Sequence, residues 1–188
     1  MPIGVWTEPK TYSAGQMVTA SDKNTYESGN LEYLHDTPAC ELRASISPGV
    51  GTSDQEVIPV ADVWTSPKGM TAVFDTDSMA QNGTIVIPEA GCYLVVGRVY
   101  WAYIFDTKTA HLGVFVDDKV DTRLLMSLID PWRGMYVACF LRLAKDQVLQ
   151  LMVKHDRASA WNIERGITEA HAELYGPRLT VVRVGPGL

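Results

Sequence analysis

Cysteine is scarce in this sequence, and the three cysteines lie far apart, at positions 40, 92 and 139. An odd number with this spacing offers neither a disulfide framework nor the paired cysteines of a zinc knuckle. Apolar or strand-forming residues surround each one. We therefore expect Cys40, Cys92 and Cys139 to be buried free thiols in a protein made in a reducing compartment.

Basic residues and long apolar runs are also scarce. The 16 Lys and Arg against 22 Asp and Glu give a net charge of −6, without the basic cluster that phosphate contacts need. No run approaches the roughly 18 consecutive apolar residues that span a bilayer. The first residues also lack the basic and apolar regions of a secretory signal. We therefore expect neither a nucleic-acid partner nor a membrane partner.

Common catalytic and metal-binding motifs are missing as well. The four histidines form neither HxxxH nor HExxH, and no GxSxG elbow exposes a serine. Four aspartates lack EF-hand spacing and suit turns better than calcium sites: Asp75, Asp77, Asp117 and Asp118. Four acidic residues leave a hydrolytic carboxylate pair conceivable: Asp156, Glu164, Glu169 and Glu173. Surface acids need no such role, so we expect no enzyme, no cofactor and no metal.

The most strand-like stretch of the chain is residues 82–103, NGTIVIPEAGCYLVVGRVYWAY. Asn82-Gly83 predicts a turn before a short β-branched run, and residues 88–91 reverse the chain before a longer run. Alternate side chains of a strand point to opposite sides, and both sides of the longer run are largely apolar. We expect this strand in the middle of a sandwich or inside an oligomer.

Short strands and turns follow one another from Cys40 onward. Alternation predicts a strand at 41–47, with Leu42, Ala44 and Ile46 facing inward. Further strands are predicted at 56–58, 70–74, 111–116, 122–129, 135–143, 148–154 and 178–184. This pattern is typical of a mainly β protein, an antiparallel jelly-roll sandwich.

The first residues follow a different pattern. Residues 1–18 carry turn formers and bulky side chains without a period, which predicts an extended N-terminal arm. Thr19-Ala20-Ser21-Asp22 begins one short helix, because a hydroxyl caps the first turn and an aspartate meets the positive end of the helix dipole. Thr37-Pro38 ends the helix. We therefore divide the chain into an anchoring segment, residues 1–38, and a head domain, residues 39–188.

From Ala39 to Val184 the sequence resembles the trimeric jelly roll shared by the globular head of the first complement component and by tumour necrosis factor. The resemblance lies in residues 82–85, 88–93, 98–101, 134–136, 143–151 and 179–184. Within these segments, Lys145 stands where that family usually has glycine. The resemblance implies a homotrimer, packed through apolar outward faces of the sandwich. The residues expected at this trimer interface are Tyr93, Val95, Val99, Trp101 and Tyr103.

Residues 11–36 resemble the opening segment of tailed-bacteriophage structural proteins. The similar residues are YSAGQMVTASDKN at 12–24, then Asn30-Leu31 and Tyr33-Leu34. Tyr12 stands where tryptophan is usual, and Lys23 where leucine is usual. This resemblance implies an anchor that docks on the major capsid protein or another virion protein. The expected anchoring residues are Trp6, Tyr12, Tyr26, Leu31, Tyr33 and Leu34.

Together the two resemblances imply a homotrimeric structural protein of a phage virion. Its arm would attach it to the capsid as a decoration protein or head fibre. Such a protein would be made in the host cytoplasm and would end on the capsid surface. Three arms on one trimer would turn weak single contacts into a long residence time.

A second hypothesis is a receptor-binding or tail-tip module that recognises a host surface glycan or protein. The candidate ligand-binding residues are Trp132 with Arg133, in a turn, and Trp161 with Asn162. The latter pair falls in a predicted loop, residues 157–175, that is long for a sandwich connection. The alternative role for both tryptophans is core or interface packing, which we favour.

Overall fold

The structure is a computed structural model and describes residues 11, 13–14, 16–17, 19–22, 37–44, 55–58, 64, 66–67, 70–101, 109–129, 134–159, 161–164 and 176–186. The chain divides into two compact units, Met1–Pro38 and Ala39–Leu188.

In the first unit, the described residues include the beginning of a helix, α1 (Ala20–Asp22). The Asp22 N–H donates to Thr19 Oγ1 at 3.1 Å, and the Thr19 N–H donates to Asp22 Oδ2 at 3.0 Å. This reciprocal pair is a capping box and confirms the predicted helix start. All six expected anchoring residues lie outside the described residues, so their role stays a prediction: Trp6, Tyr12, Tyr26, Leu31, Tyr33 and Leu34.

The second unit is built from strands. They are β1 (Ala39–Ala44), β2 (Gln55–Ile58), β3 (Met70–Asp75), β4 (Ala80–Gln81), β5 (Thr84–Val86), β6 (Gly91–Val99), β7 (Thr109–Val116), β8 (Lys119–Ile129), β9 (Met135–Leu143), β10 (Val148–His155), β11 (Trp161–Glu164) and β12 (Arg178–Pro186). β11 lies where the sequence predicted only a long loop, and it pairs with β2.

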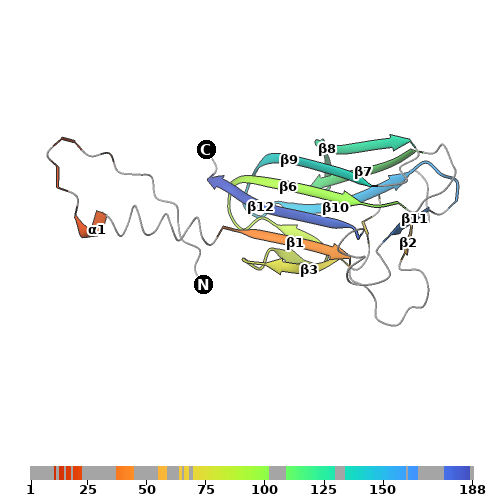
Figure 1. Ribbon diagram of the computed structural model, residues 1–188, viewed down its shortest axis with the longest axis horizontal. Helices are drawn as coiled ribbons and strands as arrows, with labels where there is room; N and C mark the ends of the chain where they lie inside the picture. The colour runs from red at the N-terminus through yellow and green to blue at the C-terminus, as the bar shows by residue number, and fades with distance from the viewer. Residues whose placement is uncertain are drawn as a thin grey trace. The chain divides into compact units, whose positions relative to one another are not determined.

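Ten of the strands form two five-stranded antiparallel sheets. The first, called the β6 sheet, has the order β3-β1-β12-β6-β9, and the second, called the β7 sheet, has the order β4-β5-β10-β7-β8. Figure 1 shows the β6 sheet in front of the strands β10, β7 and β8. Without the edge strands β3 and β4, the orders are those of two interleaved Greek keys, which confirms the antiparallel jelly roll.

The core lies between the two sheets. The inward side chains of β6 include Tyr93, Val95 and Val99, none of which has exposed surface. Between them, Gly97 leaves room for the opposite sheet, because a Cβ there would lie 3.0 Å from the side chains of Leu151 and Val114 of that sheet, and 3.0 Å from Val137 on the neighbouring strand β9. This spacing is tighter than ordinary van der Waals contact, so the core is closely packed at this point.

Several turns have the predicted backbone conformations. Asn82 and Gly83 have φ angles of 48° and 82°, as a two-residue hairpin turn between β4 and β5 requires. Asp117 and Asp118, at 49° and 63°, turn the chain between β7 and β8. The carboxylate of Asp75 accepts hydrogen bonds from the N–H groups of Met79 and Ala80, at 2.7 and 2.9 Å. These aspartates therefore have structural roles in turns.

Metal-ligating clusters and membrane-spanning helices are both missing from the described residues. No group of three or more His, Cys, Asp and Glu side chains there could hold a metal ion. Nor does the described part of the chain contain a helix long and apolar enough to cross a membrane.

The three cysteines are free, but they differ in burial. Cys40 is buried as predicted, whereas Cys92 and Cys139 are only half-buried, which corrects the expectation for these two. Burial, together with the negative charges of Asp75 and Glu41, raises the pKa of the Cys40 thiol to about 12. Because the thiolate is the reactive form, Cys40 is expected to be inert at neutral pH.

Candidate self-association surface

The residues predicted at a trimer interface lie in the interior of the single chain. Tyr93, Val95 and Val99 have no exposed surface, and Trp101 has 1%. Side chains without exposed surface have none to offer to a partner subunit, so the interface cannot be formed by this side of β6. Tyr103 lies outside the described residues.

The opposite side of the same strand carries an apolar surface. Leu94 and Val96 of β6 alternate with the buried residues and are half-buried. They lie across from Phe140 and Ala138 of β9, and from Val182 and Thr180 of β12. We call the following residues the outward patch: Leu94, Val96, Ala138, Phe140, Val182 and Val184.

The outward patch is unusually open to solvent for apolar residues. Phe140 is 62% exposed and Val184 is 50% exposed. Full burial of one large apolar side chain stabilises by about 1.5–3 kcal/mol, and this gain is not realised in the isolated chain. Contiguous apolar surface of this kind marks interaction sites on soluble proteins.

A row of three arginines borders the patch on the same face. Arg43, Arg178 and Arg98 lie directly across from one another on β1, β12 and β6. Like charges opposite each other in a sheet are destabilising. Glu41 offsets part of this cost, since its Oε1 lies 3.5 Å from Arg43 Nη2 and 3.4 Å from Arg178 Nε. The face is therefore apolar over the patch and basic beside it.

Arg98 is held at the end of this row by aromatic rings. Its guanidinium carbon lies 5.6 Å from the centre of the Tyr100 ring, which meets the Tyr136 ring edge to face at 5.8 Å. Burial, and after it the charge of Arg178, lowers the pKa of Arg98 from its ordinary value. Tyr136 is 50% exposed and lies across from Arg98 on β9. It extends the row to the edge of the sheet.

The predicted ligand-binding residues do not meet at a surface site. Trp161 is 2% exposed and packs against Trp101, with 4.9 Å between ring centres, and against His155, at 5.9 Å. A buried ring cannot stack on a ligand, so core packing, the favoured alternative, is the role that the structure gives Trp161. Asn162 is half-buried on β11. Trp132 and Arg133 lie outside the described residues.

In the sequence, the residues of β6 in the outward patch form the second of the two alternating sets of side chains in residues 92–103. Both sides of residues 92–103 are apolar, so periodicity alone does not say which side faces the second sheet. The useful signal is Gly97. A glycine within a run of large residues indicates a close approach of another backbone or side chain, and this places Tyr93, Val95 and Val99 inside.

Comparison with known proteins adds little at the level of sequence. No family model matches the sequence, and no curated protein does. Three crystal structures of murine APRIL, at pH 5.0, 8.0 and 8.5, resemble the chain with 14%, 13% and 14% identity. In each case the TM-score is 0.48, and the match covers 79% of this chain and 99% of the other. The fold assignment rests on the strand order.

Proposed function

We propose that this chain is a structural protein of a phage virion. It associates with copies of itself through the outward face of the β6 sheet, and residues 1–38 attach it to a capsid protein. The observation that carries the self-association is the exposure of Phe140 beside Leu94, on a face with no described element covering it. The attachment is supported by the resemblance of residues 11–36 to phage structural proteins.

The position of the patch in the sheet allows a second copy to cover it. The patch runs from β12 and β6 in the middle of the sheet to β9 at its edge. An edge that carries Phe140 can pack on the middle of a neighbouring sheet, where Leu94, Val96 and Val182 lie. Such a contact joins two different surfaces of identical subunits. Repetition of the contact gives a closed ring when the rotation that relates neighbouring subunits adds up to a full turn. The resemblance to trimeric jelly rolls supports a ring of three.

Charge also favours a second copy. The chain has a net charge of −6, although three of its 16 basic residues gather in the arginine row. The remaining residues of the chain therefore carry a larger net negative charge. The net negative charge of a second copy therefore favours its approach to the arginine row.

The mass of the full chain in dilute solution tests self-association. Sedimentation equilibrium should give three times the chain mass, over a range of concentrations. A single-chain mass at all concentrations would contradict the proposal for the outward face. Any other multiple of the chain mass would agree with self-association but would contradict a ring of three.

Attachment to particles tests the role of the first unit separately. A truncated chain, residues 39–188, should fold and self-associate like the full chain, yet it should no longer bind to particles that lack this protein. Co-sedimentation with such particles measures binding. Binding by the truncated chain would show that the anchor lies in the head domain.

The receptor-binding hypothesis receives no support from Trp161, which is buried. Location distinguishes the two roles on the particle. Many copies distributed over the head shell are expected for a decoration protein, whereas a few copies at the tail tip are expected for a receptor-binding module. Electron microscopy of labelled particles distinguishes these arrangements.

A further inference from the structure

A cleft of about 770 Å³ opens at the edge of the sandwich where β3 and β4 lie. Its residues come from β1, β3, the β4–β5 hairpin, β10 and the short segment 66–67. The cleft forms because β5 pairs with β10 only at Val148 and Leu149. From Gln150 onward, no described strand covers this edge of β10.

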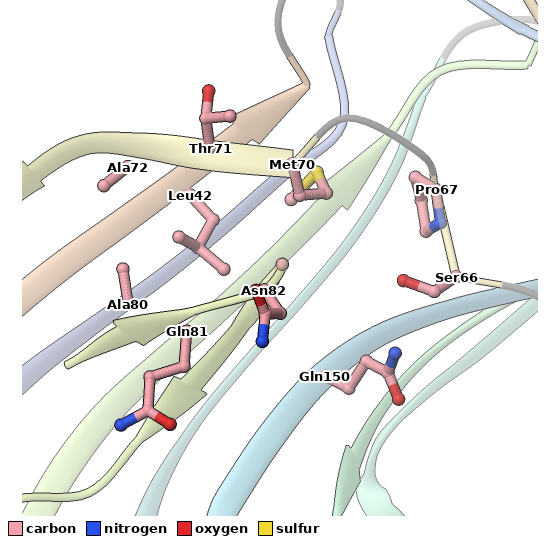
Figure 2. A pocket seen from close by; sticks show the side chains of 11 residues that line it. Leu42, Ser66, Pro67, Met70, Thr71, Ala72, Ala80, Gln81, Asn82 and Gln150 are labelled. Atoms are coloured by element: carbon pink, nitrogen blue, oxygen red, sulfur yellow. The ribbon is translucent and has the colours of Figure 1, made fainter.

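Three neutral polar side chains surround the opening. Figure 2 shows Ser66, Asn82 and Gln150 around it, with Leu42 and Met70 above, while Thr71 and Gln81 point away. The side chains of Ser66, Asn82 and Gln150 make no hydrogen bond with any residue that the structure describes. Their amide and hydroxyl groups, which both donate and accept, are therefore available to a ligand.

The opposite wall is aliphatic. Leu42 and Met70 are almost fully buried, at 1% and 6% exposed, and Pro67 is buried beside them. None of the described residues that line the cleft is charged. A charged ligand would lose hydration here without gaining a partner of opposite charge, which is unfavourable. The lining thus selects a neutral ligand with one polar edge and one apolar face.

We propose that this cleft binds a neutral saccharide. A sugar ring has hydroxyl groups along its edge that both donate and accept, and its C–H face is apolar. The hydroxyls match Ser66, Asn82 and Gln150, and the C–H face matches the accessible aliphatic residues Ala72 and Ala80, behind which Leu42 and Met70 are buried. The volume suits a short oligosaccharide, since ligand sites in proteins measure about 300–1,000 Å³.

An extended peptide fits this place less well. A peptide would bind by adding a strand to the edge strand β3. However, β3 has a register shift opposite Glu41 and Leu42, and such an irregularity interrupts the ladder that an added strand needs. Because no aromatic ring is among the described residues that line the cleft, the affinity of one site is expected to be low, with a Kd of about 1 mM or weaker.

Saturation-transfer NMR on the full chain tests this site. The probes are maltotriose, cellotriose and triacetylchitotriose, with a trimer of glucuronate and a tetra-alanine peptide blocked at both ends for comparison. At least one neutral sugar should bind, and the glucuronate trimer should not. Binding of only the charged sugar, binding of only the peptide, or no binding of any neutral sugar would overturn the proposal.

Substitutions in the cleft locate the binding. Gln150→Ala and Ser66→Ala should each weaken the affinity for the neutral sugar about fivefold, the loss of one hydrogen bond. Ser159→Ala is the matched control, because Ser159 is exposed in the bend after β10 and does not line the cleft. If all three variants bind the sugar with the affinity of the wild-type chain, the sugar binds outside the cleft. The affinity for the sugar is measured without reference to the mass of the assembly. Failure of the saccharide proposal can therefore be distinguished from failure of the proposed self-association.

Discussion

Phe140 on β9 lies directly across from Leu94 on β6, and both side chains point away from the core of their own chain. Cross-strand apolar pairs stabilise a sheet most when they are buried, yet Phe140 is 62% exposed. The pair is therefore only partly shielded in a single subunit. In the proposed assembly, a partner subunit covers the pair and completes its burial.

The first prediction concerns this pair. Phe140→Glu should weaken self-association at least about 100-fold, because it places a charge in the centre of the proposed interface. The free energy of unfolding of the monomer should change by less than about 0.5 kcal/mol, since residue 140 is at the surface. Sedimentation velocity and chemical denaturation measure the two effects.

The matched control for Phe140→Glu is Leu125→Glu. Leu125 is 40% exposed and lies on β8, in the other sheet. This variant should keep the mass of the wild-type assembly. If Leu125→Glu dissociates the assembly and Phe140→Glu does not, the interface lies on the β7 sheet.

The second prediction concerns the close packing at Gly97. Gly97→Ala should lower the free energy of unfolding by about 1–3 kcal/mol, because the new methyl group would lie 3.0 Å from three side chains of the core. Gly185→Ala is the control, since nothing lies within 4 Å of a Cβ at that position. Urea denaturation of both variants measures the difference. Equal stabilities would show that the core relaxes around the methyl group.

The third prediction concerns thiol reactivity. With a pKa of about 12, Cys40 should not react with a thiol reagent at neutral pH while the protein is folded. Cys92 is half-buried on the outward face, across from Arg142. It should react faster in Phe140→Glu than in the wild-type assembly. Mass spectrometry of labelled peptides identifies the modified cysteine, and equal rates for Cys92 in both proteins would place it outside the interface.

The fourth prediction concerns pH and Asp117. The Val148 N–H, and after it the Gln147 side chain, donate to this carboxylate and lower its pKa from 3.8. A carboxyl with a lowered pKa stabilises the fold above its unfolded pKa, and this contribution is lost as the pH falls through the folded value. Asp117→Asn should therefore be slightly less stable than wild type at neutral pH, with the difference vanishing well below pH 3.8.

Asparagine is a suitable replacement for Asp117 because it also adopts the left-handed conformation of this turn. The site is exposed, so the effect should shrink in high salt. Denaturation at a series of pH values measures it. A difference that stays constant down to low pH would show that the ionised carboxylate is not responsible.

The sequence predicts most of the fold because strands and turns are local features. Alternation at Leu42 and Ala44, and the Asn82-Gly83 turn, depend on neighbouring residues, and the structure confirms both. The strand β11 was missed because its partner β2 is about a hundred residues earlier in the chain. Pairing over such a distance leaves no periodic signal in a four-residue strand.

The candidate interface was harder to predict for a different reason. Val95 and Val96 are the same residue type, and only the position of the second sheet decides which is buried. The cleft was missed altogether, because its polar residues come from three separate segments. Ser66, Asn82 and Gln150 become neighbours only through the short pairing of β5 with β10.

The alternation along β6 places the residues of the core and the residues of the proposed interface at different positions of one strand. Positions 93, 95, 97 and 99 are buried in the core of the domain, whereas 94 and 96 are half-buried on the opposite side of the strand. In the proposed assembly, substitutions at positions 94 and 96 should therefore change how many copies associate, while each copy still folds. Under this proposal, one or two substitutions there should accordingly give a folded single-copy variant.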